Sequence, residues 1–493
     1  MPWMFKRILL LGLATLWPVL FAGAQTAAQQ YVNRQAQSGP LREAAWGVLA
    51  VDRDGNTLAS WNPHQRLTPA SNLKLVTTGA ALHAFGPDYR FQTGIGYTGQ
   101  IRDGVLEGDV YIIGHGDPTL GARDSIAVET GRLFWRWKTL LRKAGIQKIQ
   151  GRIIGDGTAY EGNLEHPSWD YNDVGTYYGA GANALCFYQN AVDLEVQAVA
   201  EGQPVTVRQS YPETPWMHFQ NYSITGPAGT GNSLYLYTTD LAPYAELRGS
   251  FAIGRKPKTE HFANKFGALT CAYYFWKNLR ETGWEVCGGY ADVDRSGYIR
   301  GADFVPAEKA ATPTLLGQTE SAPLKDIVRI TNVRSDNFYA EAILRAMGEQ
   351  ATQMALYDSC LVAHRQVLED LGVDPDGIRQ VDGSGLSGMN YVSPAWMVNY
   401  LQAMQKSPAF DAFLASLPHP GEGTLTVLLP QTEGRERIRV KSGSMDGVLC
   451  YSGYILDNEG HPRVTLSLMT NHTTAPVAEV RAVLARLLKL LME

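Results

Sequence analysis

The sequence has 493 residues, and 43 lysines and arginines against 48 aspartates and glutamates give a formal net charge of −5. With 45% hydrophobic and 18% charged residues the chain can form buried cores, which excludes a disordered protein, and this balance argues against nucleic acid as a partner. The length favours about three domains. The 50 glycines and 24 tyrosines indicate a protein rich in turns and sheets.

Residues 1–24 are typical of a secretory signal peptide. The basic pair Lys6-Arg7 precedes the apolar run 8–21, and residues 22–24 form an A-x-A cleavage pattern. Because the run is short for a membrane span, an uncleaved anchor is the weaker interpretation. We therefore expect an exported protein of the periplasm or cell envelope.

Export permits disulfide bonds, but five cysteines are too few to be the framework of so long a chain. Their odd number leaves at least one cysteine unpaired in a monomer. Cys271 and Cys287 are close in sequence and form the most plausible pair. Five buried thiols that behave as small apolar groups are an equally good alternative.

Apolar residues alternate around Asp54-Gly55, which predicts a β-hairpin over residues 46–61, and a helix is expected over 71–85. Residues 90–260 contain short alternating segments with glycine turns and few helical periods, and a helix is expected over 263–282. Beyond residue 318 the chain returns to mixed structure. Helices are expected over 324–334, 337–349, 357–371, 393–406 and 477–491, and strands over 435–443, 448–456 and 463–470.

The economical interpretation is an α/β (α+β) domain built from both ends of the chain, with a large, mainly β insertion between them. The two ends comprise residues 25–90 and 311–493. The insertion divides into a second domain, residues 91–189 and 261–310, and a third domain nested within it, residues 190–260. Since the flanking segments have to form one core, the two ends of the insertion should lie close together.

Two patterns that suggest other enzyme classes are incomplete. Residues 94–99 match the dinucleotide fingerprint G-x-G-x-x-G, but a turn between strands follows where that fold needs a helix. Ser387 lacks the closing glycine of a G-x-S-x-G elbow, which disfavours an α/β-hydrolase. The ten histidines show no metal-ligand spacing, so we expect neither a metal nor another cofactor.

Three short motifs occur in an order that points to one chemistry. Ser71 and Lys74 form the only S-x-x-K of the chain, and at positions i and i+3 of a helix the amine can accept the proton of the hydroxyl. Ser335-Asp336-Asn337 is an S-x-N, and Lys441-Ser442-Gly443, followed by Ser444, is a K-[ST]-G. Each motif alone is weak evidence of function, but the three in this order are a strong signal.

With these motifs, the sequence resembles the penicillin-recognising serine acyltransferases. More specifically, it is similar to the class C, type 4 penicillin-binding proteins, which are D-alanyl-D-alanine carboxypeptidases and endopeptidases with large inserted domains. The resemblance implies an antiparallel sheet flanked by helices, peptidoglycan peptides as substrates and β-lactam antibiotics as acylating inhibitors. Five further stretches carry it: residues 108–111, 116–120, 321–324, 382–387 and 423–425.

The resemblance implies a catalytic group of three residues. Ser71 attacks the carbonyl of the D-Ala-D-Ala bond with Lys74 as base, and Ser335 relays a proton to the leaving amine. A free lysine has a pKa of about 10.4 and is almost wholly protonated at neutral pH. The pKa of Lys74 must therefore be lowered by burial or by a positive neighbour, for which Lys441 is the obvious candidate.

The substrate-binding residues that the resemblance implies hold the peptide, bind its carboxylate and stabilise the oxyanion. They are Asn337 for the peptide amide, Lys441 and Ser442 for the terminal carboxylate, the backbone N–H groups of Ser71 and Ser444 for the oxyanion, and Asp156 for the side chain of the diamino acid.

Each assignment has a structural alternative. Ser335 and Asn337 could cap the helix that follows them, Lys441 could be a solvated lysine at a strand edge, and Asp156 could be a turn aspartate. The C-terminal helix is basic opposite its apolar face, which would suit peripheral contact with a membrane, although packing on the sheet is the better interpretation. For the whole protein, the alternatives are a β-lactamase and a non-catalytic wall-binding scaffold.

Overall fold

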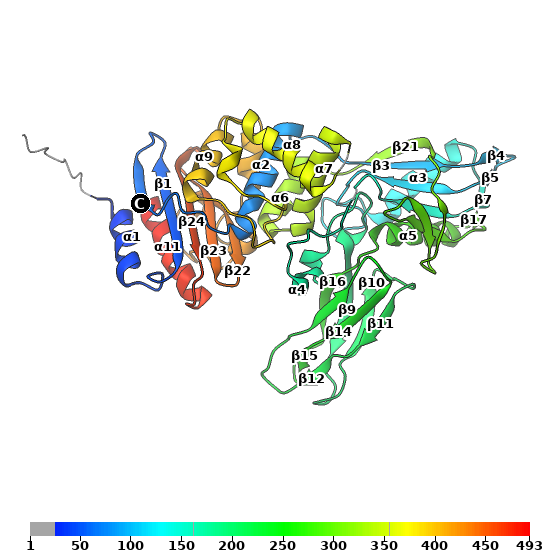
Figure 1. Cartoon of the computed structure of the whole chain (residues 1–493), viewed down its shortest axis with the longest axis horizontal. Helices are drawn as coiled ribbons and strands as arrows, with labels where there is room; N and C mark the ends of the chain where they lie inside the picture. Colours follow the sequence, from blue (N-terminus) through cyan, green and yellow to red (C-terminus); the bar gives the residue numbers. More distant parts are fainter. Residues whose placement is uncertain (1–24, 161, 354) are drawn as a thin grey trace, which may run out of the picture.

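The computed structural model describes residues 25–160, 162–353 and 355–493. The predicted signal peptide, residues 1–24, lies outside this description. Figure 1 shows an elongated molecule in which the two ends of the chain, blue and red, lie side by side at one end. The middle of the chain, cyan to green, forms the other end.

A five-stranded antiparallel sheet joins the two ends of the chain. It has the order β2-β1-β24-β23-β22, so that β24 lies between the N-terminal hairpin and the C-terminal strands. The antiparallel sheet that the resemblance implies is therefore confirmed. Its strands are β1 (Ala45–Asp52), β2 (Thr57–Trp61), β22 (Ile438–Met445), β23 (Val448–Leu456) and β24 (Pro462–Asn471).

Apolar residues alternate along these strands, so each face of the sheet has its own core. On β24, Leu466 and Leu468 face one core and Met469 faces the other. The first core is covered by α1 (Ala27–Ser38) and α11 (Val477–Met492). The second is covered by α2 (Leu73–Phe85), α6 (Leu324–Arg334), α7 (Asn337–Thr352), α8 (Tyr357–Asp370), α9 (Pro394–Met404) and α10 (Phe410–Ser416).

Helix α2 lies at the centre of the second core. Its ten residues from Leu73 to Leu82 are all buried, which is typical of a helix that is apolar on every side and surrounded by others. It ends before Gly86, whose φ of 80° only glycine adopts without strain. The central position of α2 holds the residues at its N-terminus in a rigid environment.

The insertion has a seven-stranded mixed sheet of order β20-β19-β18-β8-β6-β3-β21. Gln92 pairs with Glu320, so the first and last strands of the insertion are neighbours. The predicted boundary at residue 310 is therefore too early, because 314–320 pair within this sheet. The strands are β3 (Gln92–Tyr97), β6 (Val110–Gly114), β8 (Ile153–Asp156), β18 (Tyr290–Val293), β19 (Tyr298–Gly301), β20 (Pro306–Lys309) and β21 (Thr314–Glu320).

A smaller sheet and two long helices complete this part of the insertion. Helix α5 (Gly267–Glu281) was expected, but α3 (Thr130–Lys143) was not. The G-x-G-x-x-G stretch lies on β3 and in the turn that follows it, and the next element is the strand β4 rather than a helix. Strands β3 and β4 belong to different sheets, so the stretch is not itself a hairpin. The smaller sheet contains β4 (Gln100–Arg102), β5 (Val105–Glu107), β7 (Lys148–Ile149) and β17 (Glu285–Val286).

A separate all-β lobe projects from the insertion (Figure 1) and has an apolar core of its own. The short helix α4 (Tyr171–Val174) and the 3-10 turn η2 (Tyr177–Gly179) precede the first strand of this lobe along the chain. Its strands are β9 (Ala191–Gln197), β10 (Thr206–Tyr211), β11 (His218–Asn221), β12 (Ile224–Gly226), β13 (Tyr235–Thr238), β14 (Tyr244–Arg248), β15 (Ser250–Ala252) and β16 (Lys258–Ala263).

The structure corrects the expectation about the cysteines and agrees with the preferred placement of the C-terminal helix. The suggested disulfide is wrong: all five cysteines are free, since Cys271 on α5 points into the core while Cys287 is exposed. The apolar face of α11 packs on the sheet, in agreement with the better interpretation of that helix. Among the described residues, no helix is both long and apolar enough to span a membrane.

Candidate active site

The S-x-x-K motif lies where the chain enters α2. Ser71 is in the 3-10 turn η1 (Ala70–Asn72), and Lys74 is in the first turn of α2. The Lys74 Nζ lies 3.0 Å from the Ser71 Oγ. The i, i+3 spacing therefore brings the amine to the hydroxyl, as the sequence predicts.

Lys74 is completely buried, and its amine has three hydrogen-bond partners. Nζ lies 2.6 Å from the Asn337 Oδ1 and 2.7 Å from the Ser384 carbonyl oxygen, in addition to the Ser71 Oγ. The two carbonyl-type oxygens can only accept hydrogen bonds. A neutral amine has two N–H groups for them, and its lone pair then points at the Ser71 hydroxyl.

Burial lowers the pKa of Lys74 to about 8, although the negative charges of Asp382, Glu341 and Asp336 oppose this shift. The main cause is therefore the loss of solvation of the charged amine rather than a positive neighbour. A substantial fraction of Lys74 is neutral near pH 8, which is the state that a general base requires.

The S-x-N segment joins α6 to α7. Ser335 ends α6 with a φ of 60°, in the left-handed region that residues with a side chain rarely adopt. Asp336 is the N-cap of α7, because its side chain accepts from the Tyr339 N–H at 2.9 Å. The capping alternative thus applies to the middle residue of the motif, and the side chains of Ser335 and Asn337 make other contacts.

The amide of Asn337 is oriented by contacts at both of its ends. Its Oδ1 accepts from Lys74, and its Nδ2 donates to the Tyr178 carbonyl at 3.1 Å. Tyr178 belongs to the insertion, as does Trp169, whose indole Nε1 donates to Asp382 at 2.9 Å. The insertion therefore contacts the residues that surround Lys74.

Lys441 lies on β22, which is an edge strand, yet its side chain is buried. The alternative of a solvated lysine is therefore wrong. Its Nζ donates to the Ser335 Oγ at 2.9 Å and to the Ser442 carbonyl at 2.7 Å. Burial, and then the charge of Lys74, holds the pKa of Lys441 well below its ordinary value.

Strand β22 passes directly beside the turn that carries Ser71. A Cβ on Gly443 would lie 2.3 Å from the Pro69 carbonyl oxygen and 3.1 Å from the Ser71 nitrogen, so only glycine permits this approach. Ser444 follows Gly443 directly on the same strand. On the same strand, the Ser442 Oγ lies 2.7 Å from the Thr424 Oγ1, which places a second hydroxyl there.

Glu341 is a residue of the site that sequence reasoning missed. Its buried carboxylate accepts from the N–H groups of Gly383 and Ser384, the latter at 2.7 Å, and so fixes the loop whose carbonyl contacts Lys74. Burial, with the charge of Asp382, raises the pKa of Glu341 to about 7. One signal was present: Glu341 follows Asn337 by four residues and lies on the same helix face.

Asp156 is not brought into this cluster. Its Oδ1 accepts from the Thr158 N–H at 2.9 Å and from the Thr158 hydroxyl at 2.6 Å, at the end of β8. These contacts are those of a turn aspartate. Among the described residues, no group of three or more histidine, cysteine or carboxylate side chains is placed to hold a metal ion.

The chain matches the D-Ala-D-Ala carboxypeptidase 3 (S13) family over residues 28–491. It belongs to this family. It is 28% identical over 481 residues to a D-alanyl-D-alanine carboxypeptidase of Actinomadura sp., covering 94% of this chain and 84% of that one. It is 23% identical over 450 residues to the D-alanyl-D-alanine carboxypeptidase DacB of Haemophilus influenzae, covering 87% of this chain and 86% of that one.

The fold agrees with the family assignment. The crystal structure of penicillin binding protein 4 from Haemophilus influenzae superposes with a TM-score of 0.77 at 22% identity, covering 92% of this chain and 98% of that one. Membership of the S13 family confirms the expectation of an enzyme, namely a serine-type D-Ala-D-Ala carboxypeptidase.

Proposed function

We propose that this carboxypeptidase is exported, acts on peptidoglycan peptides through an acyl-enzyme at Ser71, and also cleaves peptide cross-links as an endopeptidase. The observation that carries the proposal is a pair of buried lysines, Lys74 and Lys441, that contact the hydroxyls of Ser71 and Ser335. In the described part of the chain neither lysine has an ion-pair partner, and burying such groups costs stability. A non-catalytic scaffold would have no use for them.

Acylation begins with neutral Lys74. As the Ser71 Oγ attacks the carbonyl carbon of the substrate, its proton moves to the Lys74 Nζ, 3.0 Å away. The backbone N–H groups of Ser71 and Ser444 donate to the oxyanion that forms. They stabilise the tetrahedral state more than the planar substrate, which is what accelerates the step.

The leaving amine then needs a proton. Lys441 donates to the Ser335 Oγ, which leaves the Ser335 O–H to donate toward the amine. The proton that Lys74 took from Ser71 passes by way of Ser335 to the amine as the C–N bond breaks. Lys74 is neutral again and accepts a proton from the water that hydrolyses the ester.

Recognition of the substrate carboxylate is assigned to Lys441 and Ser442, with Thr424 as a third donor beside them. A β-lactam presents a strained amide and a carboxylate in a similar arrangement. The protein from Haemophilus influenzae that shares this fold has been crystallised with a β-lactam. This supports β-lactams as acylating inhibitors here, while Asp156, for which only turn contacts are described, is retained as a proposed contact of the diamino acid.

The experiment is to incubate the protein with benzylpenicillin and map the modified peptide by mass spectrometry. We expect one penicilloyl group on Ser71. A penicilloyl group on another serine, or no modification at all, would show that Ser71 is not the nucleophile. The lifetime of the adduct decides the β-lactamase alternative, because a β-lactamase releases it rapidly whereas a carboxypeptidase of this kind retains it.

A further inference from the structure

A pocket of about 310 Å³ adjoins the S-x-N segment, and the mechanism above does not use it. Residues 334–338 form one wall. The insertion and its β lobe form the other, with Tyr177, Tyr178, Gln189 and His261. The volume is within the range of sites that bind small molecules and peptide segments.

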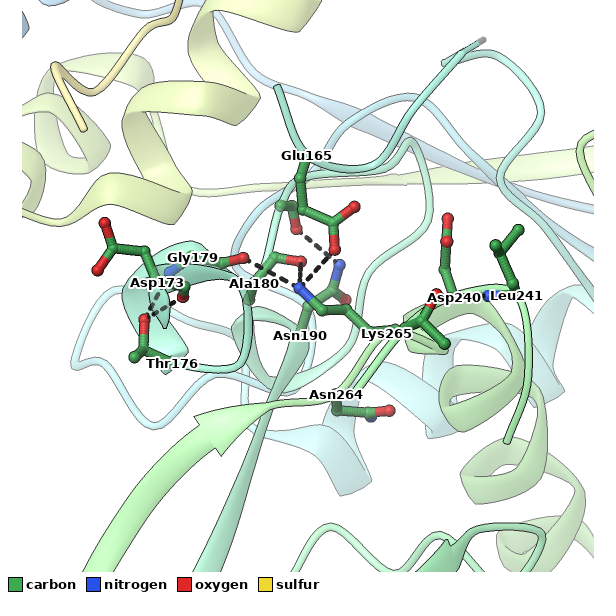
Figure 2. Close-up of polar contacts among 12 residues, drawn as sticks. Glu165, Asp173, Thr176, Gly179, Ala180, Asn190, Asp240, Leu241, Asn264 and Lys265 are labelled. Atoms are coloured by element: carbon green, nitrogen blue, oxygen red, sulfur yellow. Dashed lines mark hydrogen bonds and ion pairs between the residues drawn. The ribbon is translucent and has the colours of Figure 1, made fainter. Parts of the chain in front are cut away.

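A buried lysine, Lys265, contacts the backbone at Gly179 and Ala180 (Figure 2), which directly follows Tyr177 and Tyr178 in the chain. The Lys265 Nζ donates to the carbonyls of Gly179 and Ala180 at 3.0 and 3.1 Å and forms an ion pair of 2.6 Å with Glu165. The side chain of Lys265 is fully buried. The pocket therefore has a pre-formed wall rather than a loop that folds over a ligand.

The rest of that wall is also held by specific contacts. Tyr188, Gln189 and the following residue all have left-handed backbone conformations, with φ of 54°, 54° and 50°. This strained turn directs the Gln189 amide to Asp336 at 2.7 Å. Asp193 accepts from Tyr188 at 2.8 Å and contacts the ring of His261 at 2.6 Å, which raises the pKa of the histidine.

The pocket lies beside the residue that is assigned to protonate the leaving amine, so its position relates it to the leaving group of the reaction. Ser335 lines the pocket and is also the residue assigned to protonate the leaving amine. A terminal D-Ala ends at its own carboxylate beside Lys441 and needs no further space. In a cross-link the same amine belongs to the side chain of a diamino acid, which continues into a second peptide strand.

We infer that this pocket holds the leaving strand of a cross-linked peptidoglycan peptide. The inference rests on the proposed function and specifies its substrate class. The lining suits such a strand, since the tyrosine rings pack against its apolar parts and His261 and Arg334 face its free carboxylates. Arg334 is paired with Asp124 and His261 with Asp193, so carboxylates hold both of these basic side chains in place at the pocket.

The test uses two substrates with the same acyl donor: a pentapeptide stem, which releases D-Ala, and a cross-linked dimer, which releases a peptide. The variants are Tyr177→Ala and His261→Ala, and kcat/KM is measured for both substrates. We expect each variant to lower the value for the dimer by about tenfold, as for truncation of a side chain at a binding site. The value for the pentapeptide should change less than about twofold.

Two control variants match the exposure of the tested residues on the same insertion. Tyr222 is 54% exposed, against 53% for Tyr177, and His218 is an exposed histidine of the β lobe. We expect Tyr222→Ala and His218→Ala to leave both substrates unaffected. Unchanged acylation of Ser71 by penicillin shows that each variant is folded.

Equal loss for both substrates would overturn the inference, because the pocket would then bind the acyl donor. No loss for either, or no cleavage of the dimer by the wild-type protein, would also overturn it. Failure of the proposed function looks different, since penicillin would then not acylate Ser71 in the wild-type protein at all.

Discussion

Two buried lysines, one in the active site and one in the insertion, differ in what contacts their amines. Lys265 has a carboxylate, Glu165, at 2.6 Å and two backbone carbonyls. Lys74 has a hydroxyl, a side-chain amide and a backbone carbonyl. Burial lowers the pKa of both, but at Lys265 the ion pair opposes the shift by direct contact.

The comparison shows how one residue type performs two tasks. The charged form of an amine in contact with a carboxylate is stabilised by the ion pair, and such an amine holds the backbone carbonyls that it contacts in place. An amine surrounded by neutral groups can release its proton at moderate pH and accept another. The groups that contact the amine, rather than its burial, therefore decide whether a buried lysine has a structural role or acts as a general base.

The largest expected effect is on the chemistry of Lys74. Lys74→Ala should lower the rate of acylation by labelled penicillin by roughly 10²–10⁴-fold, the usual contribution of a general base. Lys265→Met, measured on the folded fraction, should leave this rate within about threefold of wild type, because Lys265 contacts no group assigned to the reaction. Wild-type acylation by the Lys74 variant would show that the base is misassigned.

The second effect is on stability and concerns Lys265. Lys265→Met leaves the Glu165 carboxylate largely buried and unpaired, so the free energy of unfolding should fall by about 3–5 kcal/mol. Urea denaturation followed by tryptophan fluorescence measures the change. The double variant Lys265→Met, Glu165→Gln should recover part of the loss, and a double variant less stable than the single one would argue against the ion pair.

The third effect is the pH dependence of acylation. Lys74 acts as a base only when neutral, and its pKa is lowered to about 8. The rate should therefore fall about tenfold for each pH unit below 8 and level off above it. Lys265→Met should keep the midpoint of this profile, whereas a rate that is constant from pH 6 to about pH 9 would contradict a titrating base.

The smallest effect concerns a carboxylate that is near Lys74 without contacting it. The charge of Glu341 raises the pKa of Lys74, so Glu341→Gln should lower the pKa further. The midpoint of the acylation profile should move to lower pH by less than about one unit. A shift to higher pH would mean that the loop has moved and that Glu341 acts mainly by holding it.

Local periodicity predicted the elements of the two chain ends closely. The predicted helix over 324–334 and the strand over 448–456 agree with α6 and β23. Helix α3 was missed for physical reasons: its N-cap is Glu129, an uncommon cap residue, and its first turns contain aromatic residues that are weak helix formers. The disulfide failed because sequence proximity does not reveal which way a helical cysteine points.

The three motifs predicted that Ser71, Lys74 and Ser335 lie together with Lys441, because their order is specific. The supporting contacts could not be predicted in this way. Asn337 and Tyr178 are 159 residues apart, and no local pattern marks a backbone carbonyl as the partner of an amide. Such contacts depend on how the insertion docks, which is a property of the whole fold.

The central place of β24 also sets an order of assembly. This strand follows every other strand in the chain, yet it alone joins the hairpin of β1 and β2 to β23. During synthesis the nucleophile therefore emerges early, but the sheet that brings Lys441 to it cannot close until β24 has been made. Pairing of such distant segments is slow. The pairing of β1 with β24 joins residues 45–52 to residues 464–471, so this sheet forms only after almost the whole chain has been synthesised.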